Sequence, residues 1–160
     1  MQRVVGVADF IVSREAGEHL VTYALGSCLG VAVHDAVAGV GGLLHVMLPQ
    51  SSIDPERATN QPGAFVDTGV PTLFRECYKL GAKKERMAVF VAGGASSGPD
   101  DQDHFQIGKR NLVALRRLLW KNGVLVRAED VGGVQTSRTM RLDVGTGEVT
   151  LRHNGGMRRL

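Results

Sequence analysis

The chain has 160 residues, of which 43% are hydrophobic and 22% are charged, and a net charge of +3. This composition predicts one globular domain over residues 1–160 and excludes a disordered chain, while the small charge gives no indication of a nucleic-acid partner. No apolar run approaches the roughly eighteen residues of a membrane span, and the N-terminus, Met1 to Gly6, lacks the apolar stretch of a signal peptide. We therefore expect a cytoplasmic protein, not inserted in a membrane, whose two cysteines stay reduced.

Hydrophobic periodicity and the positions of glycine predict a chain dominated by strands, with two helices. In chain order, the expected strands cover 3–12, 20–25, 29–33, 43–48, 87–92, 124–129, 140–144 and 148–152, and the expected helices cover 67–80 and 107–122. The strand 29–33 is apolar throughout, which is typical of a strand covered on both faces. Residues 50–63 and the acidic stretch 96–106 are expected to be loops, and the tail 154–160 is expected to be frayed.

The turns between these strands indicate the fold class. Gly145-Thr-Gly147, between two alternating segments, is the strongest hairpin signal in the chain. Several hairpins imply sheets that are largely antiparallel or mixed, and the fold class is therefore predicted to be α+β.

The main functional signal is a thiol on a turn. Gly26 and Ser27 present Cys28 between two apolar runs, and His45 lies on the strand 43–48. If the two strands form a hairpin, one register places Gly30 opposite His45, with Cys28 on the same face about 7–8 Å away between backbone positions. A slip of one residue would place Cys28 and His45 on opposite faces. A thiol with a nearby base is the outline of a nucleophile.

Two further groups complete this outline. The hydroxyl of Thr22 is placed to accept the second ring N–H of His45 and so to fix its tautomer. The turn also frees the backbone N–H groups of Ser27 and Cys28, which are predicted to form an oxyanion hole. From these residues alone, a buried thiol and a strand histidine without chemistry stay the alternative.

The other candidate residues give weaker signals. Cys77 lies on the apolar face of the helix 67–80 and is expected in the core. His19, His34, His104 and His153 show no metal-ligand spacing with either cysteine, so no metal site is expected. The glycine-rich stretch 93–98 follows a strand but lacks the Gly-Lys-Ser/Thr of a phosphate loop, and it is interpreted as a tight turn.

Five motifs together make the chain resemble a known family. They are Thr22-x-x-Leu-Gly-Ser-Cys28, Gly42-x-x-His45-x-Met-Leu-Pro49, Gly93-Gly-Ala95, Ile107-Gly-x-Arg-Asn111 and Asp130-x-Gly-Gly133. In order and spacing they are similar to the motifs of the chemoreceptor glutamine deamidases, the CheD family, over nearly the whole chain. The resemblance implies layered mixed or antiparallel β-sheets with helices packed outside, similar to the fold of the deamidating toxins.

The resemblance also implies an activity. In that family a Cys-His-Thr triad converts glutamines of methyl-accepting chemotaxis receptors to glutamates through a thioester, releasing ammonia and using no cofactor. The matching residues are Cys28, His45 and Thr22. A CheC-type phosphatase is a further partner that the resemblance implies. Two alternatives stay open: a non-enzymatic chemotaxis adaptor that binds CheC and receptors, and a thiol hydrolase that acts on other amides or peptides.

Overall fold

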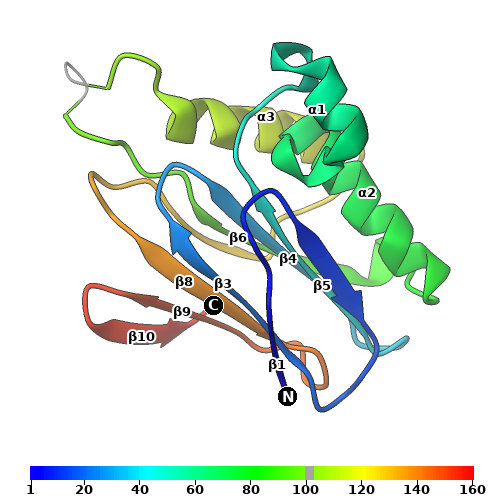
Figure 1. Ribbon diagram of the computed structural model, residues 1–160. Coiled ribbons are helices and arrows are strands. Elements are labelled where there is room, and N and C mark those ends of the chain that lie inside the picture. Colours follow the sequence, from blue (N-terminus) through cyan, green and yellow to red (C-terminus); the bar gives the residue numbers. More distant parts are fainter. Residues whose placement is uncertain (100–102) are drawn as a thin grey trace.

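The computed structural model describes residues 1–99 and 103–160 of the chain. Over these residues the chain forms three layers: an outer β-sheet packs on an inner β-sheet, and helices cover the far side of the inner sheet (Figure 1). This is the predicted α+β class with helices packed outside. Residues 100–102, which belong to the acidic stretch 96–106, lie outside the described residues.

Each sheet has five strands in the described part of the chain. The outer sheet has the order β1-β3-β8-β9-β10, with β1 (Gln2–Val4), β3 (His19–Leu25), β8 (Arg138–Asp143), β9 (Val149–His153) and β10 (Gly156–Arg159). The inner sheet has the order β2-β5-β4-β6-β7, with β2 (Phe10–Ser13), β5 (Val40–Val46), β4 (Leu29–Asp35), β6 (Met87–Gly93) and β7 (Ala128–Val131). β1 pairs with β3 and β6 with β7 in parallel, whereas the other strand pairs are antiparallel, so both sheets are mixed.

Two long helices cover the inner sheet. α2 (Val66–Lys79) and α3 (Ile107–Lys121) turn their apolar faces towards it, which confirms both predicted helices. The remaining helical segments are α1 (Pro55–Asn60) and the 3₁₀ turns η1 (Ser51–Ile53), η2 (Pro62–Ala64) and η3 (Lys84–Arg86). No helix among the described residues combines the length and the apolarity that crossing a bilayer requires.

Strand β4 lies at the centre of the inner sheet and is buried along its whole length. Leu29, Val31 and Val33 belong to the core between the inner sheet and the helices. Ala32, from the opposite face of the strand, belongs to the core between the two sheets. The continuous apolar run is therefore a strand covered on both faces, as predicted.

The predicted hairpin between β4 and β5 is also present. Gly30 lies opposite His45, in the register that the sequence analysis considered, and the pairing continues without a break to Asp35 opposite Val40. This register decides which residues share a face at the open end of the hairpin. Cys28 lies two residues before Gly30 in the sequence and directly precedes the first residue of β4.

The single strand predicted over 3–12 is wrong. β1 pairs with β3 in the outer sheet, whereas β2 pairs with β5 in the inner sheet. The segment between them carries the chain from one sheet to the other, with Ala8 in the left-handed region at a φ of 64°. Val5 and Ala8 are buried at this crossing. The hydrophobic pattern therefore continues through a change of sheet, and the pattern alone could not reveal that change.

The predicted loop over 50–63 is wrong because it contains α1. This helix begins at Pro55, and the carboxylate of Asp54 accepts a hydrogen bond from the N–H of Arg57 at 3.1 Å. An aspartate cap followed by proline at the first helical position is a helix-start signal. The helix is only six residues long, so it offers no apolar periodicity to support that signal.

The tail over 154–160 is not frayed, as it contains β10. This strand pairs antiparallel with β9, and the turn that joins the two strands consists of Asn154 and Gly155, whose φ angles are 51° and 74°. Positive φ at both central residues is the requirement of a tight two-residue hairpin, and Asn-Gly is its strongest sequence signal. The strand predicted over 124–129 begins later, because residues 124–127 still connect α3 to the sheet and the ladder starts at Ala128.

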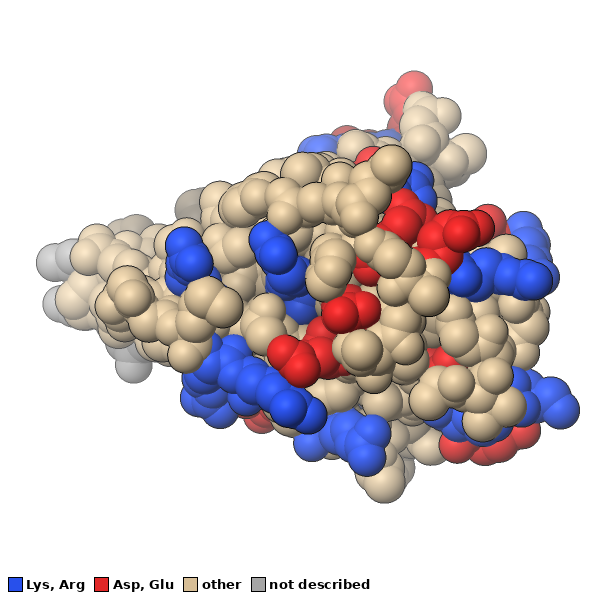
Figure 2. All heavy atoms as spheres, turned by 90° about the horizontal axis from the view of Figure 1, so that it is seen from below, with Lys and Arg blue, Asp and Glu red and all other residues tan. Residues whose placement is uncertain are grey.

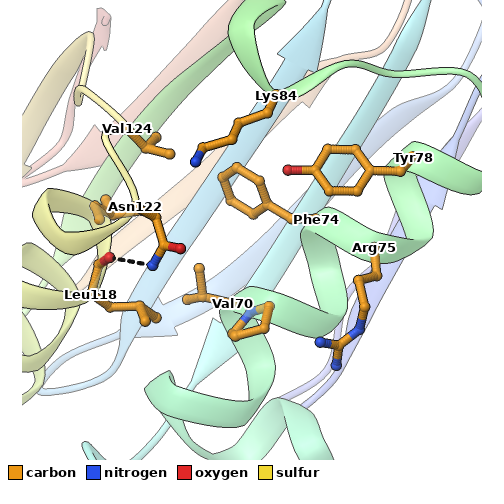
Figure 3. Close-up of a pocket in the computed structure, with 10 residues that line it drawn as sticks. Val70, Phe74, Arg75, Tyr78, Lys84, Leu118, Asn122 and Val124 are labelled. Atoms are coloured by element: carbon orange, nitrogen blue, oxygen red, sulfur yellow. Dashed lines mark hydrogen bonds between the residues drawn. The ribbon is translucent and has the colours of Figure 1, made fainter.

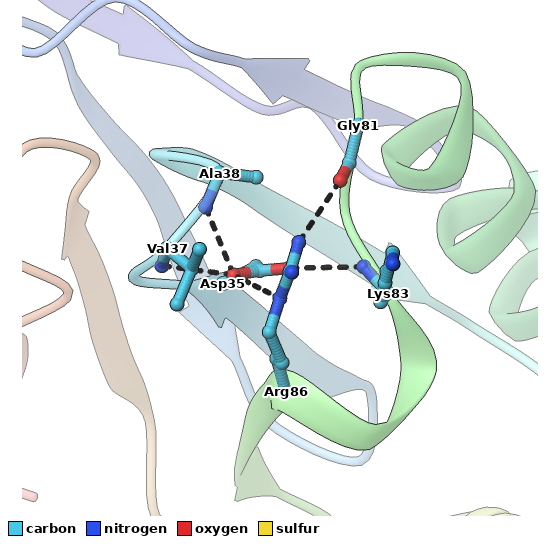
Figure 4. A network of polar contacts seen from close by, with 6 residues as sticks. All are labelled: Asp35, Val37, Ala38, Gly81, Lys83 and Arg86. Carbon is cyan, nitrogen blue, oxygen red and sulfur yellow. Dashed lines mark hydrogen bonds and ion pairs between the residues drawn. The ribbon is translucent and has the colours of Figure 1, made fainter.

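A buried carboxylate fixes the far end of β4. The side chain of Asp35 is fully buried and accepts hydrogen bonds from the N–H groups of Val37, Ala38 and Lys83, as well as from Nε of Arg86 at 2.9 Å (Figure 4). Burial by itself would raise the pKa of Asp35, but these hydrogen bonds outweigh it and the pKa lies below the ordinary value of 3.8. The carboxylate ties the β4–β5 turn to the segment that leads into β6.

Replacing this carboxylate with an amide is expected to destabilise the fold. Asp35→Asn removes the negative charge that faces Arg86. It also replaces one accepting oxygen with an NH2 group, which cannot accept from the surrounding N–H donors. Together these losses should lower the free energy of unfolding by about 3 kcal/mol. Because the folded pKa of Asp35 is lowered, its contribution is present above the unfolded pKa of about 3.9 and is lost as the pH falls through the folded value. Urea unfolding at pH 7 and near pH 3 measures both effects.

Glu85→Gln is the matched control, since Glu85 is an exposed carboxylate one residue from Arg86. It should change the stability by less than about 0.5 kcal/mol. Equal stability of Asp35→Asn and Glu85→Gln at pH 7 would contradict a structural role for the network.

Candidate active site

A hydrogen bond between the two sheets forms the centre of the candidate site. Thr22 Oγ1, on β3 of the outer sheet, lies 2.7 Å from Nδ1 of His45, on β5 of the inner sheet. The relative exposure of the two residues is 0% and 1%. The structure therefore brings together two of the residues that the sequence analysis selected, in the buried space between the sheets.

The partners of Thr22 decide the tautomer of His45. The Thr22 hydroxyl also lies 2.8 Å from the carbonyl oxygen of Val5, and that oxygen only accepts hydrogen bonds. The hydroxyl has one proton, so both contacts are satisfied together only when Thr22 donates to Val5 and accepts from Nδ1–H of His45. In the neutral ring the proton then sits on Nδ1, and Nε2 carries the free lone pair.

The Nε2 atom of His45 is buried and has no hydrogen-bond partner among the described residues. Burial lowers the pKa of His45 from 6.5 to about 4, because the charged ring would lose its hydration there. At neutral pH the ring is therefore uncharged. An unpartnered, unprotonated ring nitrogen can take a proton from a nearby acid.

Cys28 lies on the same side of the inner sheet as His45. Its side chain packs against the core between the sheets. His45 faces that core as well, since Leu43, two residues before it on β5, belongs to the same core. Cys28 is half-buried, and burial raises the pKa of its thiol while its own backbone N–H lowers it to a smaller extent. The resting thiol is thus uncharged and needs a base to become a nucleophile.

The turn that carries Cys28 is held by its carbonyl groups. The carbonyl oxygens of three successive residues, Gly26, Ser27 and Cys28, accept hydrogen bonds. Their donors are the N–H of Ala95 at 2.9 Å, Nδ2 of Asn111 at 3.0 Å and the N–H of Gly94 at 2.9 Å, respectively. Because all three oxygens are fixed, the turn has one orientation relative to β6 and α3.

Close backbone approaches make these contacts possible. Gly93 has a φ of 110°, and a β-carbon there would overlap the carbonyl oxygen of Cys28. A β-carbon at Gly108, in the first turn of α3, would overlap the carbonyl oxygen of Ala95. Glycine at both positions lets the end of β6 fit between the Cys28 turn and the start of α3. The predicted tight turn over 93–98 is wrong. No backbone hydrogen bond closes a turn within this stretch, because the N–H groups of Gly94, Ala95 and Ser96 donate to other segments.

The N–H groups of the same turn stay available. Neither Ser27 N–H nor Cys28 N–H donates a hydrogen bond to another residue in the described part of the chain. These are the two groups that the sequence analysis proposed for an oxyanion hole. Free N–H groups beside a thiol can stabilise a negative oxygen that forms there.

Asn111 is a buried residue that the sequence analysis placed in a motif but gave no role. Its Nδ2 donates to the carbonyl oxygens of Ser27 and Met47, both at 3.0 Å, and its side chain has 0% exposure. It therefore links the Cys28 turn to the chain that follows His45. A polar residue at a predicted core position of a helix is the signal that could have indicated this role.

The motif residue Asp130 has a structural partner that was also missed. Asp130 lies 3.1 Å from the guanidinium of Arg138, which is only 4% exposed. Arg138 also donates to the carbonyl oxygen of Gly93 at 3.4 Å. Since Arg138 lies on β8 and Asp130 on β7, the pair connects the outer sheet to the inner sheet beside the site.

Other candidate positions lie apart from this arrangement. Cys77 is fully buried in the helix-side core, as expected. No group of three metal-ligating side chains occurs in the described segments, 1–99 and 103–160. A cavity of about 190 Å³ lies between α2 and α3, where Phe74, Tyr78 and Lys84 point towards Asn122 and Val124 (Figure 3). It contains none of the predicted site residues.

A thiol and a buried imidazole that face the same core, with the second ring nitrogen held by a hydroxyl, form an arrangement suited to thiol-dependent hydrolysis. Comparison with known proteins identifies the family. The model of the CheD family, described as CheD chemotactic sensory transduction, matches residues 47–153. The chain belongs to the CheD family.

Individual relatives match along nearly the whole chain. A protein of Syntrophus aciditrophicus (strain SB) named "Probable chemoreceptor glutamine deamidase CheD 1" is 51% identical, over 96% of this chain and 94% of that protein. A protein of Solibacter usitatus (strain Ellin6076) named "Probable chemoreceptor glutamine deamidase CheD" is 48% identical, over 99% and 93%. The "Chemoreceptor glutamine deamidase CheD" of Thermotoga maritima is 39% identical, over 98% and 94%.

Removing the Asn111 side chain is expected to loosen the Cys28 turn. Asn111→Ala leaves the buried carbonyl groups of Ser27 and Met47 without donors, which should cost about 2–3 kcal/mol of stability. Cys28 should also react faster with a thiol reagent in the folded protein. Urea unfolding and the rate of thiol alkylation measure the two effects.

Asn122→Ala, at the residue that directly follows the last residue of α3, is the matched control. Asn122 is exposed and its Nδ2 donates to the carbonyl oxygen of Leu118 at 2.8 Å, away from the turn (Figure 3). It should leave the alkylation rate unchanged. If both variants alkylate at the wild-type rate, Asn111 does not hold the turn.

Proposed function

We propose that this protein, acting as one cytoplasmic domain, hydrolyses glutamine side-chain amides of methyl-accepting chemotaxis receptors to glutamate. Cys28 is the nucleophile, His45 is the general base and acid, and Thr22 orients His45. The observation that supports this most strongly is the buried Thr22–His45 hydrogen bond, which leaves Nε2 unprotonated on the side of the sheet where Cys28 packs. The relatives are named chemoreceptor glutamine deamidases, and these names suggest the substrate.

The first half of the reaction forms a thioester. Nε2 of His45 takes the proton of the Cys28 thiol as the sulfur attacks the carbonyl carbon of the amide. The C=O electron pair moves to oxygen, and a tetrahedral intermediate forms. When the C–N bond breaks, the His45 imidazolium gives its proton to the leaving nitrogen, and ammonia departs. Neutral Cys28 and His45 in the resting site favour this concerted route over a preformed thiolate.

The second half hydrolyses the thioester. Nε2 of His45 takes a proton from a water molecule, whose oxygen attacks the thioester carbonyl. The C–S bond breaks, the thiolate recovers a proton from His45, and the product is a glutamate side chain. The N–H groups of Ser27 and Cys28 stabilise the oxyanion in both halves, and one such donor typically contributes about 100-fold or more to the rate. Every group in the cycle belongs to the chain, the substrate or water.

The competing hypothesis is an adaptor that binds receptors and a CheC-type phosphatase without chemistry. The two functions differ in what happens to the receptor. An adaptor leaves the receptor's mass unchanged, whereas a deamidase adds about one dalton for each glutamine converted. A general thiol hydrolase would also act on small amides without a receptor.

The decisive experiment incubates a receptor cytoplasmic fragment with the protein and measures both ammonia release and the mass of the fragment's peptides. Wild type should release ammonia and increase the mass at specific glutamines. Cys28→Ala should keep the fold and lose activity by at least about 100-fold, because no other group replaces the nucleophile. Full activity of Cys28→Ala would refute the mechanism.

Two Thr22 variants provide the matched comparison for the orienting role. Thr22→Val keeps the shape but removes the hydroxyl that accepts from Nδ1 of His45, so activity should fall about tenfold or more. Thr22→Ser keeps the hydroxyl and should retain most of the activity. Equal activities of the two variants would show that the hydroxyl does not orient the base.

The pH profile tests the protonation states. The base must be unprotonated, and the pKa of His45 is about 4, so the rate should be flat from about pH 5 to about pH 8 and fall only near pH 4. The lowered pKa also means that the unfolded chain takes up this proton first, so stability decreases as the pH falls from about 6.5 towards 4. Circular dichroism at each pH shows whether the fold persists. An acid limb near pH 6.5 in the folded protein would contradict a buried neutral base.

A further inference from the structure

One face of α3 carries three cations beside a groove. Lys109, Arg110 and Arg117 are exposed, and they line a cavity of about 290 Å³ together with Val113. The spacing of these positions places them on one side of the helix. The opposite wall is formed by Pro49 and Gln50, and none of the described residues that line the groove is acidic. We call this surface the basic groove.

The position of these cations does not serve the helix itself. The first turn of α3 contains no acidic residue, and Lys109 lies in it with Arg110 directly after. The N-terminal end of a helix carries partial positive charge, so cations there are unfavourable for the isolated helix. The carboxylate of Asp103 caps this end by accepting a hydrogen bond from the N–H of Gln106 at 2.9 Å, but it forms no ion pair with Lys109 or Arg110 among the described residues. The two cations are therefore available to an anion from outside the helix.

These cations also differ from their neighbour on the same helix. Arg116 pairs with Glu129 at 2.6 Å. In contrast, the side chains of Lys109, Arg110 and Arg117 form no ion pair within the described residues, 1–99 and 103–160. Figure 2 shows a different distribution on the face seen from below, where acidic and basic side chains are interspersed. Among the described residues that line the basic groove, every charged side chain is a cation.

The groove adjoins the candidate active site. Asn111, next to Arg110 in α3, holds the carbonyl of Ser27 in the Cys28 turn and the carbonyl of Met47. Met47 is two residues before Pro49 in the groove wall, and it follows β5, which carries His45. The Cys28 turn and the basic groove are therefore connected through Asn111 and residues 47–49.

We propose that the basic groove binds carboxylates of the substrate polypeptide that lie near the reacting glutamine, an inference that rests on the proposed deamidase function. Each turnover replaces a neutral amide with a carboxylate, so a segment with several glutamines becomes a stronger ligand for the groove as it reacts. The protein then prefers segments that already bear negative charge, and one deamidation promotes the next on the same segment.

The test compares two synthetic peptides that each contain one glutamine. The acidic peptide has glutamate at three flanking positions, and the neutral peptide has alanine there. Binding is measured by fluorescence anisotropy on the Cys28→Ala background, which cannot turn over the peptide, and ammonia release is measured separately with wild-type Cys28. The groove variants are Lys109→Glu and Arg117→Glu. Arg75→Glu, an exposed position on α2 away from the groove, is the control with the same change in net charge.

We expect the acidic peptide to bind about tenfold more tightly than the neutral one at low salt, with an advantage that decreases as salt is added. Each groove variant should weaken binding of the acidic peptide about tenfold and leave the neutral peptide unchanged, while Arg75→Glu has no effect. Equal affinity for the two peptides, including no detectable binding of either, would overturn the proposal.

Two other outcomes would also overturn it. If Arg75→Glu weakens binding of the acidic peptide as much as the groove variants do, the affinity responds to net charge alone. If an oligonucleotide of the same charge binds as tightly as the acidic peptide, the groove is a general polyanion-binding surface. The ammonia assay keeps the two proposals apart. Charge-selective binding without ammonia from either peptide or from a receptor fragment would count against the deamidase function alone, whereas ammonia release at the same efficiency from both peptides would count against the groove alone.

Discussion

The hydrogen bond between Thr22 and His45 is the contact on which the site depends, because it joins the two sheets at their buried interface. It requires the sheets to approach closely at this point. Gly30, opposite His45, helps to provide that approach, since a β-carbon there would lie 2.8 Å from side-chain atoms of both Leu25 and Met140 of the outer sheet. An irregularity in β3 after Thr22, with Ala24 at a φ of 58°, sets the path of the chain into the Cys28 turn.

The helical layer contributes to the site from the other side of the inner sheet. α3 reaches the Cys28 turn through Asn111, while β6 reaches it through Gly94 and Ala95. The thiol is therefore positioned by one set of elements and the imidazole by another. Their relative geometry follows from the packing of all three layers, and this explains why motif residues from distant parts of the sequence meet around one turn.

Much of the fold could be predicted because it follows from local patterns. Periodicity predicted both long helices and the continuous apolar strand β4. The register of Gly30 opposite His45 was one of the registers that the turn length allowed, and the structure has that one. The errors arose where the deciding information is non-local or short. The change of sheet between β1 and β2 leaves no gap in the hydrophobic pattern, and β10 depends on a two-residue turn at Asn154 that composition alone made resemble a loose tail.

The site could be predicted only where it follows from local sequence patterns. The Thr22–His45 contact follows from the strand pattern together with family resemblance, whereas the part played by Asn111 depends on the way α3 lies across the sheet. No spacing rule connects residue 111 with residue 27. A buried asparagine on a helix indicates that a polar partner exists, but only the tertiary structure identifies the partner.

Because the imidazole and the hydroxyl bonded to it belong to different sheets, the candidate site has no subdomain of its own that could survive partial unfolding. Any thermal fluctuation that separates the two sheets breaks the hydrogen bond between Thr22 and His45. The proposed activity would therefore be lost on heating together with the cooperative unfolding of both sheets, and its measurement would report on the integrity of the entire fold.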